Sequence, residues 1–233
     1  MEEVKVEEMD VMLLVDRFGY ARCVDVPTFE RNIDAATTES KYIVKCKNVG
    51  KVCFFTNTGQ LHTIKVMDLP FGKFRDKGIP IDNVSNYSAE KEQIVAVASQ
   101  SELNLYRIVF VTKQSMMKIV DGGEFDVMKK TVAATKLADD DEVVSVSVIR
   151  EQTHIVLRSA DGYFLRFPIE EIPEKKKGAI GVRGMKLGAK DFVEEVYYHK
   201  NMVESSIVYK EKSILLNQIK LLKRDSKGTK LRV

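Results

Sequence analysis

The sequence predicts an all-β, propeller-like fold with about five blades of about four strands each. Five turn segments recur along the 233 residues, and the spacings between them are 40, 56, 47 and 50 residues. Such a period is the length of one four-stranded blade. β-branched and aromatic residues flank each turn, whereas no long apolar stripe has the period of a helix. The turns end at Gly19, Gly59, Ser115, Gly162 and Lys212.

Each turn lies between two strand-like runs, which predicts a hairpin. A second unit recurs half a period later, because Thr135–Leu137 and Met185–Leu187 are offset by 50 residues and each precedes a further β-rich run. One repeat therefore holds a hairpin, a longer loop and one or two more strands. The runs before the five turns are Val11–Val15, Val52–Thr56, Ile108–Thr112, Ile155–Arg158 and Ile207–Tyr209.

These repeats predict a single domain over residues 1–233, in which an N-terminal strand closes the ring with the last repeat. A β-sandwich is the other all-β layout, but five copies of one unit favour radial repetition. Helical structure is expected to amount to a turn or two within 85–92 and 100–107. The approximate repeats are 11–50, 51–106, 107–152, 153–203 and 204–233.

Composition indicates in which compartment the protein works and whether its cysteines are oxidised. Hydrophobic residues make up 44% of the chain and charged residues 30%, with a net charge of +3. The N-terminus is acidic and its first apolar run is too short for a secretory signal or a membrane span, so we expect a cytoplasmic protein without membrane contact. Cys23, Cys46 and Cys53 are an odd number without paired spacing, which predicts buried thiols rather than disulfides or zinc ligands.

The chain offers no convincing catalytic signature. It contains neither a Walker A loop nor the nucleophile elbow of hydrolases. The glycines within 178–184 follow a lysine run, unlike those of a dinucleotide-binding loop. Asp139–Glu142 offers the carboxylates that divalent cations prefer, but an acidic turn before a strand is the simpler interpretation. We therefore predict no catalytic residue, no metal and no cofactor in this domain.

Basic residues gather in the longer loops of successive repeats. Segments 173–190 and 220–232 each hold six Lys or Arg against one acidic residue, a net charge of +5. Smaller basic clusters occupy 73–77 and 129–130. Comparable places in a radial fold lie on one rim, and basic loops with glycine suit phosphate groups. Any single lysine is more simply a solvated surface residue, but the repeated pattern favours binding of nucleic acid.

The hairpins supply a second basic set. Arg22, His62 and Lys118 each lie three residues after a turn position, whereas Leu165 and Leu215 hold that place in the last two repeats. Arg166 is next to Leu165. The predicted DNA-binding residues from both sets are Arg22, Lys73, Arg75, Lys77, Lys118, Lys129, Lys130, Arg166, Lys175, Lys176, Lys177, Arg183, Lys186, Lys223 and Arg224.

Two segments carry a family resemblance. Leu61–Val66, followed by Asp68-Leu69-Pro70, is similar to the second blade of the C-terminal domain of gyrase and topoisomerase IV A subunits. Gly178–Leu187 resembles the Gly-Val-Arg-Gly segment of a later blade in that family. The repeated strand–turn–strand units are similar to the family across essentially the whole chain. The Gly-Val-Arg-Gly segment is the more specific of these signals.

The resemblance implies a β-pinwheel, whose blades exchange strands with their neighbours, and a domain that binds and bends duplex DNA. It also implies a parent type II topoisomerase that uses a tyrosine nucleophile, Mg²⁺ and ATP in other domains and in the other type of subunit. The implied partners are duplex DNA, the ATPase B subunit, the remainder of the A subunit, and one further copy of it. The implied location is the cytoplasm, in association with the nucleoid.

One departure from the family bears on function. Gyrase A subunits carry a glycine-rich basic box in the first-blade loop, whereas the corresponding stretch here is Phe29–Ala36, with Arg31, Glu30 and Asp34 and no glycine. The box is effectively absent, which favours a topoisomerase IV-like protein. The alternative is a gyrase A subunit that wraps DNA, and a propeller-like protein-interaction scaffold is a further one. A propeller enzyme is disfavoured, because no catalytic group converges.

Overall fold

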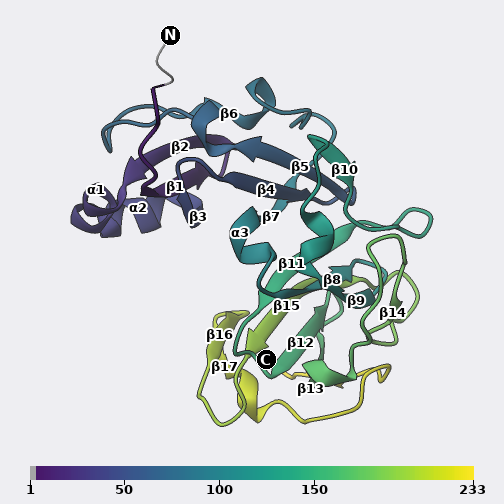
Figure 1. Ribbon diagram of the computed structural model, residues 1–233. Helices are drawn as coiled ribbons and strands as arrows, with labels where there is room; N and C mark the ends of the chain where they lie inside the picture. The colour runs from purple at the N-terminus through teal and green to yellow at the C-terminus, as the bar shows by residue number, and fades with distance from the viewer. Residues whose placement is uncertain (1–3) are drawn as a thin grey trace. The chain divides into compact units, whose positions relative to one another are not determined.

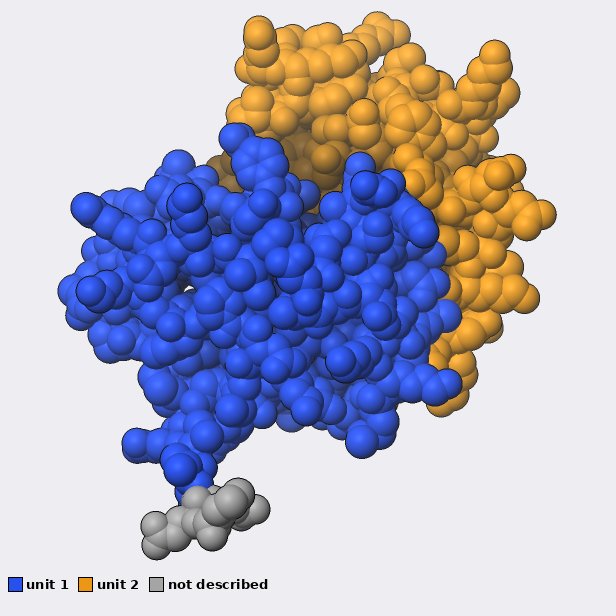
Figure 2. Space-filling view, turned by 90° about the horizontal axis from the view of Figure 1, so that it is seen from above, with its two compact units in different colours: residues 1–105, 125–134 blue, residues 106–124, 135–233 orange. Residues whose placement is uncertain are grey.

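The structure is a computed structural model that describes residues 4–233 (Figure 1). The chain forms two compact units, which Figure 2 distinguishes by colour. The first unit consists of residues 1–105 and 125–134, and the second of residues 106–124 and 135–233. The chain thus leaves the first unit, returns to it for ten residues and leaves it again. The predicted organisation as one closed domain stays a prediction, and residues 1–3 of the predicted closing strand lie outside the described residues.

Antiparallel sheets make up both units, as the sequence predicts. The first unit contains two four-stranded sheets. Their strand orders are β3(Ser40–Lys47)-β1(Asp10–Asp16)-β2(Tyr20–Asp25)-β6(Ile79–Pro80) and β10(Thr131–Ala133)-β5(Gln60–Lys65)-β4(Lys51–Thr56)-β7(Ile94–Ser99).

The second unit contains two further four-stranded sheets and a hairpin. The strand orders are β11(Val143–Ile149)-β8(Arg107–Thr112)-β9(Met116–Asp121)-β14(Val182–Arg183), then β15(Val193–His199)-β12(His154–Ser159)-β13(Tyr163–Pro168)-β18(Thr229–Lys230), and β16(Ser206–Tyr209)-β17(Lys212–Leu215). In the described residues the fifth blade is therefore this hairpin alone.

Each four-stranded blade takes its last strand from the next repeat. β6 follows β5 in sequence but pairs with β2, where Ala21 is opposite Ile79. In the same way β10 pairs with β5, β14 with β9, and β18 with β13. This arrangement confirms the strand exchange that the family resemblance implies.

The five predicted hairpins are all present. Strands β1–β2, β4–β5, β8–β9, β12–β13 and β16–β17 pair directly across the predicted turns. Gly19 and Gly59 have φ angles of 80° and 79°, a left-handed conformation that glycine adopts without a steric penalty. Lys210 and Glu211 both have positive φ in the fifth turn, as a two-residue hairpin turn requires.

The core lies between the faces of successive blades. In the first unit, Val11 and Leu13 of β1 belong to one cluster with Val52 and Phe54 of the second blade. In the second unit, Val109 of β8 packs in the same way with the fourth-blade strand that contains Ile155. Strand residues alternate between two faces, so in each of these two pairs the facing blades contribute every second strand residue to the shared core.

The first blade differs from the others, because helices cover its second face. α1(Val26–Arg31) and α2(Ile33–Glu39) pack Phe29 and Ala36 against Met12 and Leu14. The prediction of a loop at Phe29–Ala36 is therefore wrong. Asp25 caps α1 by accepting a 2.6 Å hydrogen bond from the Thr28 amide, and a proline in the first turn favours a helix start.

The other repeats have a single 3₁₀ turn in the place of α1 and α2. These turns directly follow the second strand of each hairpin and are η1(Val66–Asp68), η3(Gly122–Phe125), η4(Ile169–Glu171) and η5(Leu216–Gln218). Of the two segments expected to be weakly helical, 100–107 holds α3(Gln100–Leu103) and 85–92 holds turns. η2(Ile81–Asn83) lies just before the second of these.

The three cysteines are free and buried, as predicted. Burial raises the pKa of Cys53 to about 12 and that of Cys46 to about 11, so both thiols are protonated at neutral pH. Among residues 4–233, no helix is long and apolar enough to cross a membrane.

Candidate nucleic-acid interface

Three loops of eight residues correspond to one another position by position. We call residues 71–78, 174–181 and 221–228 the basic loops. Each begins where its first residue, Phe71, Glu174 or Leu221, forms an isolated parallel bridge with the second hairpin strand of the previous repeat, which is β2, β9 or β13. Each ends directly before an exchanged strand, which is β6, β14 or β18.

A glycine closes each basic loop because a side chain would not fit there. A Cβ atom on Gly78 would lie 2.7 Å from the carbonyl oxygen of Ala21. On Gly181 and Gly228 it would lie 2.4 Å and 2.5 Å from the carbonyl oxygens of Met117 and Phe164. The backbone of each loop therefore comes close to the hairpin strand below it, which fixes where the loop rejoins the sheet.

The third position of every basic loop is an exposed lysine: Lys73, Lys176 and Lys223. The seventh position is Lys77, Ile180 and Lys227, so two of the three loops also carry a cation there. Because the loops share their anchors, these lysines occupy equivalent places in their blades. The clusters are visible in the sequence, whereas this correspondence appears only in the strand register.

The second blade has a shorter loop in this place. Residues 126–130 lead directly into β10, and the amide of Thr63 donates a 2.8 Å hydrogen bond to the carbonyl of Lys130. Lys129 and Lys130 are both exposed. This loop therefore exposes the two predicted cations, but it lacks the final glycine by which the three basic loops approach the hairpin strand.

The two basic loops of the second unit bond to each other through their flanking residues. The Asp225 amide donates to the Gly184 carbonyl over 2.7 Å, and the Lys186 amide donates to the Ser226 carbonyl over 2.9 Å. The guanidinium of Arg183 also pairs with the Asp225 carboxylate, and this hydrogen bond lowers the pKa of Asp225. Arg183 is thus exposed but already partnered.

The fourth loop position turns back onto the protein. The Lys177 ammonium donates to the carbonyl of Glu124 over 3.2 Å. The Arg224 guanidinium donates to the carbonyls of Glu171 and Arg183 over 2.9 Å and 2.8 Å. These two predicted site residues are therefore less available to a ligand than the exposed lysine that precedes each of them.

Lys118 of the hairpin set is fully buried. Its ammonium donates to the carbonyls of Lys176, Lys177 and Ala179 over 3.0, 2.9 and 2.5 Å. Burial lowers its pKa to about 8, against an opposing effect of Glu124. The side chain cannot reach a phosphate from this position, so we leave it out of the proposed interface. It positions the second basic loop instead.

Arg22 and Arg166 hold loops as well. The half-buried Arg22 donates to the carbonyl of Phe74 in the first basic loop, and its guanidinium lies 4.8 Å from the Phe74 ring centroid. Arg166 is 7% exposed and donates to the Ile219 carbonyl over 3.2 Å and to His199 Nε2 over 3.0 Å. Both are positioning residues, and neither belongs to the exposed basic surface.

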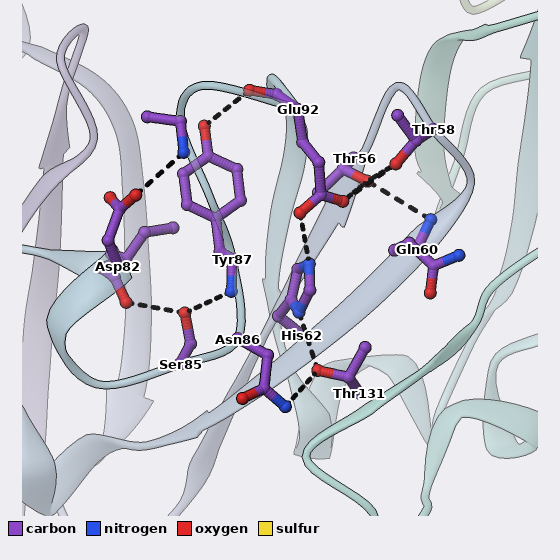
Figure 3. Close-up of polar contacts among 12 residues, drawn as sticks. Thr56, Thr58, Gln60, His62, Asp82, Ser85, Asn86, Tyr87, Glu92 and Thr131 are labelled. Atoms are coloured by element: carbon purple, nitrogen blue, oxygen red, sulfur yellow. Dashed lines mark hydrogen bonds and ion pairs between the residues drawn. The ribbon is translucent and has the colours of Figure 1, made fainter.

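His62 does the same for the second blade through a buried network (Figure 3). Its Nδ1 atom lies 2.9 Å from the Thr131 hydroxyl in β10, and its Nε2 atom lies 2.9 Å from Glu92. Glu92 also accepts hydrogen bonds from Thr56 and Thr58. Burial raises the Glu92 pKa, but these hydroxyls and His62 together hold it below its usual value. No sequence pattern indicates Glu92, which lies 30 residues from His62.

The acidic run forms a turn, as predicted. Asp141 Oδ1 accepts hydrogen bonds from the amides of Gln114 and Glu142, and so fixes the third hairpin turn. Asp191 accepts from the Asp161 amide in the equivalent place of the next repeat. Within residues 4–233, no group of three or more His, Cys, Asp or Glu side chains is arranged to hold a metal ion.

Comparison with known proteins relates the chain to one family. A family model described as "DNA gyrase C-terminal domain, beta-propeller" matches residues 106–150 and 153–197. The DNA gyrase A subunit of Lawsonia intracellularis is 26% identical over 212 residues, and that of Rickettsia conorii is 32% identical over 146. The chain is thus similar to the C-terminal domain of DNA gyrase A subunits. The matches cover 83% and 60% of this chain but only 25% and 16% of those two relatives.

Solved structures confirm the β-pinwheel fold of this chain. A topoisomerase IV C-terminal domain superposes with a TM-score of 0.83 at 22% identity, covering 96% of this chain and 73% of that one. The Escherichia coli ParC C-terminal domain gives 0.76 at 17% identity and covers 96% and 94%. A gyrase A C-terminal domain gives 0.63 at 18% identity and covers 94% and 76%.

Proposed function

We propose that this domain binds duplex DNA without sequence preference, through the basic loops and the loop at 126–130. The observation that supports the proposal is the equivalence of Lys73, Lys176 and Lys223, because a cation repeated at a fixed place in three blades matches a repeated phosphate. Lysine and arginine that displace condensed counterions provide affinity for any sequence. The proposed contacts are Lys73, Arg75, Lys77, Lys129, Lys130, Lys175, Lys176, Lys186 and Lys223.

Arg183 joins this set only if a phosphate replaces Asp225 as its partner. Lys177 and Arg224 contribute charge from more restrained positions. Arg22, Lys118 and Arg166 contribute by holding the loops rather than by touching DNA. A predicted residue thus contacts DNA directly only where its charged group is exposed and has no partner within the protein.

Base reading is not part of the proposal. The α-helices among residues 4–233 are four to seven residues long, and none presents a recognition helix for the major groove. Contacts to phosphates should therefore dominate, with bending of the duplex as the loops engage in turn. Bending a short duplex by 40–90° costs about 1–6 kcal/mol, which distributed phosphate contacts can offset.

The test is a titration of this domain with duplex DNA over a range of salt. If about 6–10 phosphates are neutralised, affinity should fall about 10³- to 10⁵-fold between 50 and 200 mM salt. Two duplexes of unrelated sequence should give the same curve. No binding at low salt, or an affinity independent of salt, would contradict the proposal and favour a protein-interaction scaffold.

We further propose that the parent protein is a topoisomerase IV-like A subunit. It would pair with another copy of itself, act with an ATPase B subunit, use ATP and Mg²⁺ outside this domain, and work on the nucleoid in the cytoplasm. The helical and mixed-charge stretch Phe29–Ala36 supports this assignment over gyrase, whose A subunits carry a basic box there. The curated relatives, which are named as DNA gyrase A subunits, support the alternative of a gyrase that wraps DNA.

A further inference from the structure

The first hairpin ends in an exposed aromatic side chain on a well-ordered turn. Phe18 lies between β1 and β2 and is 67% exposed. Asp16 fixes this turn, because its Oδ1 atom accepts hydrogen bonds from the amides of Phe18 over 2.8 Å and Tyr20 over 3.0 Å. The Phe18 ring is therefore held toward solvent by a turn of defined shape.

The fold does not require an apolar residue at this position. Thr58, Gln114 and Asp161 occupy the same place in the next three hairpins. All four turns are closed by the same backbone hydrogen bond, with lengths of 2.9–3.1 Å. Polar residues thus satisfy the turn equally well, so the turn itself does not dictate the aromatic ring at Phe18.

A groove of about 370 Å³ opens beside Phe18. It lies between the first hairpin and the 87–94 segment of the second repeat, both within the first unit. The rings of Phe18, Tyr42 and Tyr87 line it together with Arg17 and Lys41. Its volume is within the range of about 300–1,000 Å³ typical of small-ligand sites.

The groove combines these rings with cations that lack acidic partners. The Arg17 guanidinium lies 4.9 Å from the Phe18 ring centroid, and the Lys41 ammonium lies 5.6 Å from that of Tyr42. Neither cation forms an ion pair with a carboxylate of residues 4–233. The two carboxylates that line the groove are engaged internally, Asp16 by the turn amides and Glu92 by His62 and two threonines.

We propose that this groove binds an unpaired nucleotide of single-stranded nucleic acid. The base stacks on Phe18, and the adjoining phosphates lie beside Arg17 and Lys41. Single strands bind without sequence preference where aromatic rings stack on bases and cations follow the backbone. A duplex offers no free base face, so this site is distinct from the basic loops and does not depend on them.

The first experiment compares two labelled probes, a thymidine oligonucleotide of about twelve nucleotides and a duplex of the same length. Stacking contributes a factor of about 5 to 150 in affinity per base, so Phe18→Ala should weaken binding of the single strand by that factor. Affinity for the duplex should stay within about twofold, because loop contacts govern it. Gln114→Ala, at the equivalent turn position of the third hairpin, is the matched control and should change neither.

A second experiment uses the absence of tryptophan from the sequence. Phe18→Trp keeps an aromatic ring and places a single fluorophore in the site. The thymidine oligonucleotide should quench its fluorescence, with a midpoint at the same concentration as in the binding titration of the labelled single strand. The duplex should not quench it. Gln114→Trp supplies the same fluorophore away from the groove and should show no quenching by either probe.

The outcomes separate this proposal from the duplex-binding one. If Phe18→Ala binds the single strand as well as the unchanged protein does, or if the Phe18→Trp signal does not respond, the site is refuted. Equal losses for both probes would likewise refute it and assign Phe18 to the duplex surface. If the unchanged protein binds the single strand but no duplex, the duplex proposal fails and this one stands.

Discussion

Arg22 and Lys118 occupy the same place in two blades and do the same task in different ways. Lys118 is fully buried and holds three carbonyl groups of the second basic loop. Arg22 is half-buried, holds one carbonyl of the first basic loop, and lines a groove of about 640 Å³ together with Arg75 and Lys77. The comparison teaches that one fold can fix one basic loop firmly and leave its counterpart open to solvent.

The largest effect should follow from Lys118→Met, which keeps the length of the side chain but removes the ammonium. Three part-buried carbonyl groups would lose their donor, so the cost of each should lie near the lower end of the about 1–3 kcal/mol of a fully buried group. We expect the free energy of unfolding of the second unit to fall by about 3 kcal/mol in urea titrations followed by hydrogen exchange of residues 174–181. Amides of residues 71–78 should be unaffected, and a uniform loss of protection would contradict the assignment to one loop.

The lowered pKa of Lys118 predicts how the stability of the protein depends on pH. Its pKa is about 8 in the folded protein and 10.5 in the unfolded chain, so between these values the unfolded state binds more protons and stability rises with pH. From pH 7.5 to pH 9.5 the gain should be about 2 kcal/mol. The measurement is the difference between the unchanged protein and Lys118→Met, which removes contributions of other groups. A difference that does not vary with pH would show that the lysine is solvated.

Charge reversal tests whether the three basic loops contribute equally to DNA binding. Lys73→Glu and Lys176→Glu should each lower the slope of log affinity against log salt by about one unit, and Lys223→Glu likewise. Lys65→Glu, an exposed position on β5 outside the loops, is the control and should leave the slope unchanged. A full effect at Lys176 with none at Lys73 would show that only a firmly held loop binds.

Arg22→Ala should have a smaller effect on stability than Lys118→Met, about 1 kcal/mol, because one hydrogen bond to a part-exposed carbonyl is lost. Hydrogen exchange should rise in residues 71–78 and not in 174–181. Arg22→Lys keeps the charge but loses the planar contact with Phe74, so it should restore stability only in part. Full restoration by lysine would show that charge alone holds the loop.

The smallest expected effect concerns DNA topology. The stretch Phe29–Ala36 offers Arg31 against Glu30 and Asp34, all exposed, and its net charge of −1 should repel a returning phosphate backbone. We therefore expect little change in linking number when the domain is bound to nicked circles that are then ligated. A large positive shift per bound domain would restore the gyrase assignment and contradict the view that the first blade lacks a clamp.

The repeating fold could be predicted well from the sequence, because each hairpin has its own local signal. The strand-like run and the glycine of the first turn, Val11–Val15 and Gly19, are readable without any neighbour. The helices α1 and α2 were missed, because packing of Phe29 and Ala36 on Met12 and Leu14 of β1 stabilises them, and no local sequence signal shows that packing. A six-residue helix depends on such packing and has little stability of its own.

The positions of the basic residues in the candidate site could be predicted from the sequence, but which of their charged groups are free to contact a ligand could not. Lysines cluster visibly in the sequence, yet the sequence alone does not separate Lys118 from Lys176. The difference arises because strand register places Lys118 beneath a loop that lies 58 residues away, where burial and three carbonyl partners determine its role. The exposed Phe18 was missed for the opposite reason, since a single aromatic residue in a turn looks like any other strand-flanking residue.

The borrowed strands make the boundaries of the repeats differ from those of the blades. A truncation after residue 152 would keep β8, β9 and β11 but remove β14, so the third blade would lose one edge. Its second strand would then expose unpaired amides and carbonyls, which are a template for aggregation. A deletion or insertion that preserves this pairing must therefore span one whole repeat. Each remaining four-stranded blade then still receives its last strand from the repeat that follows it.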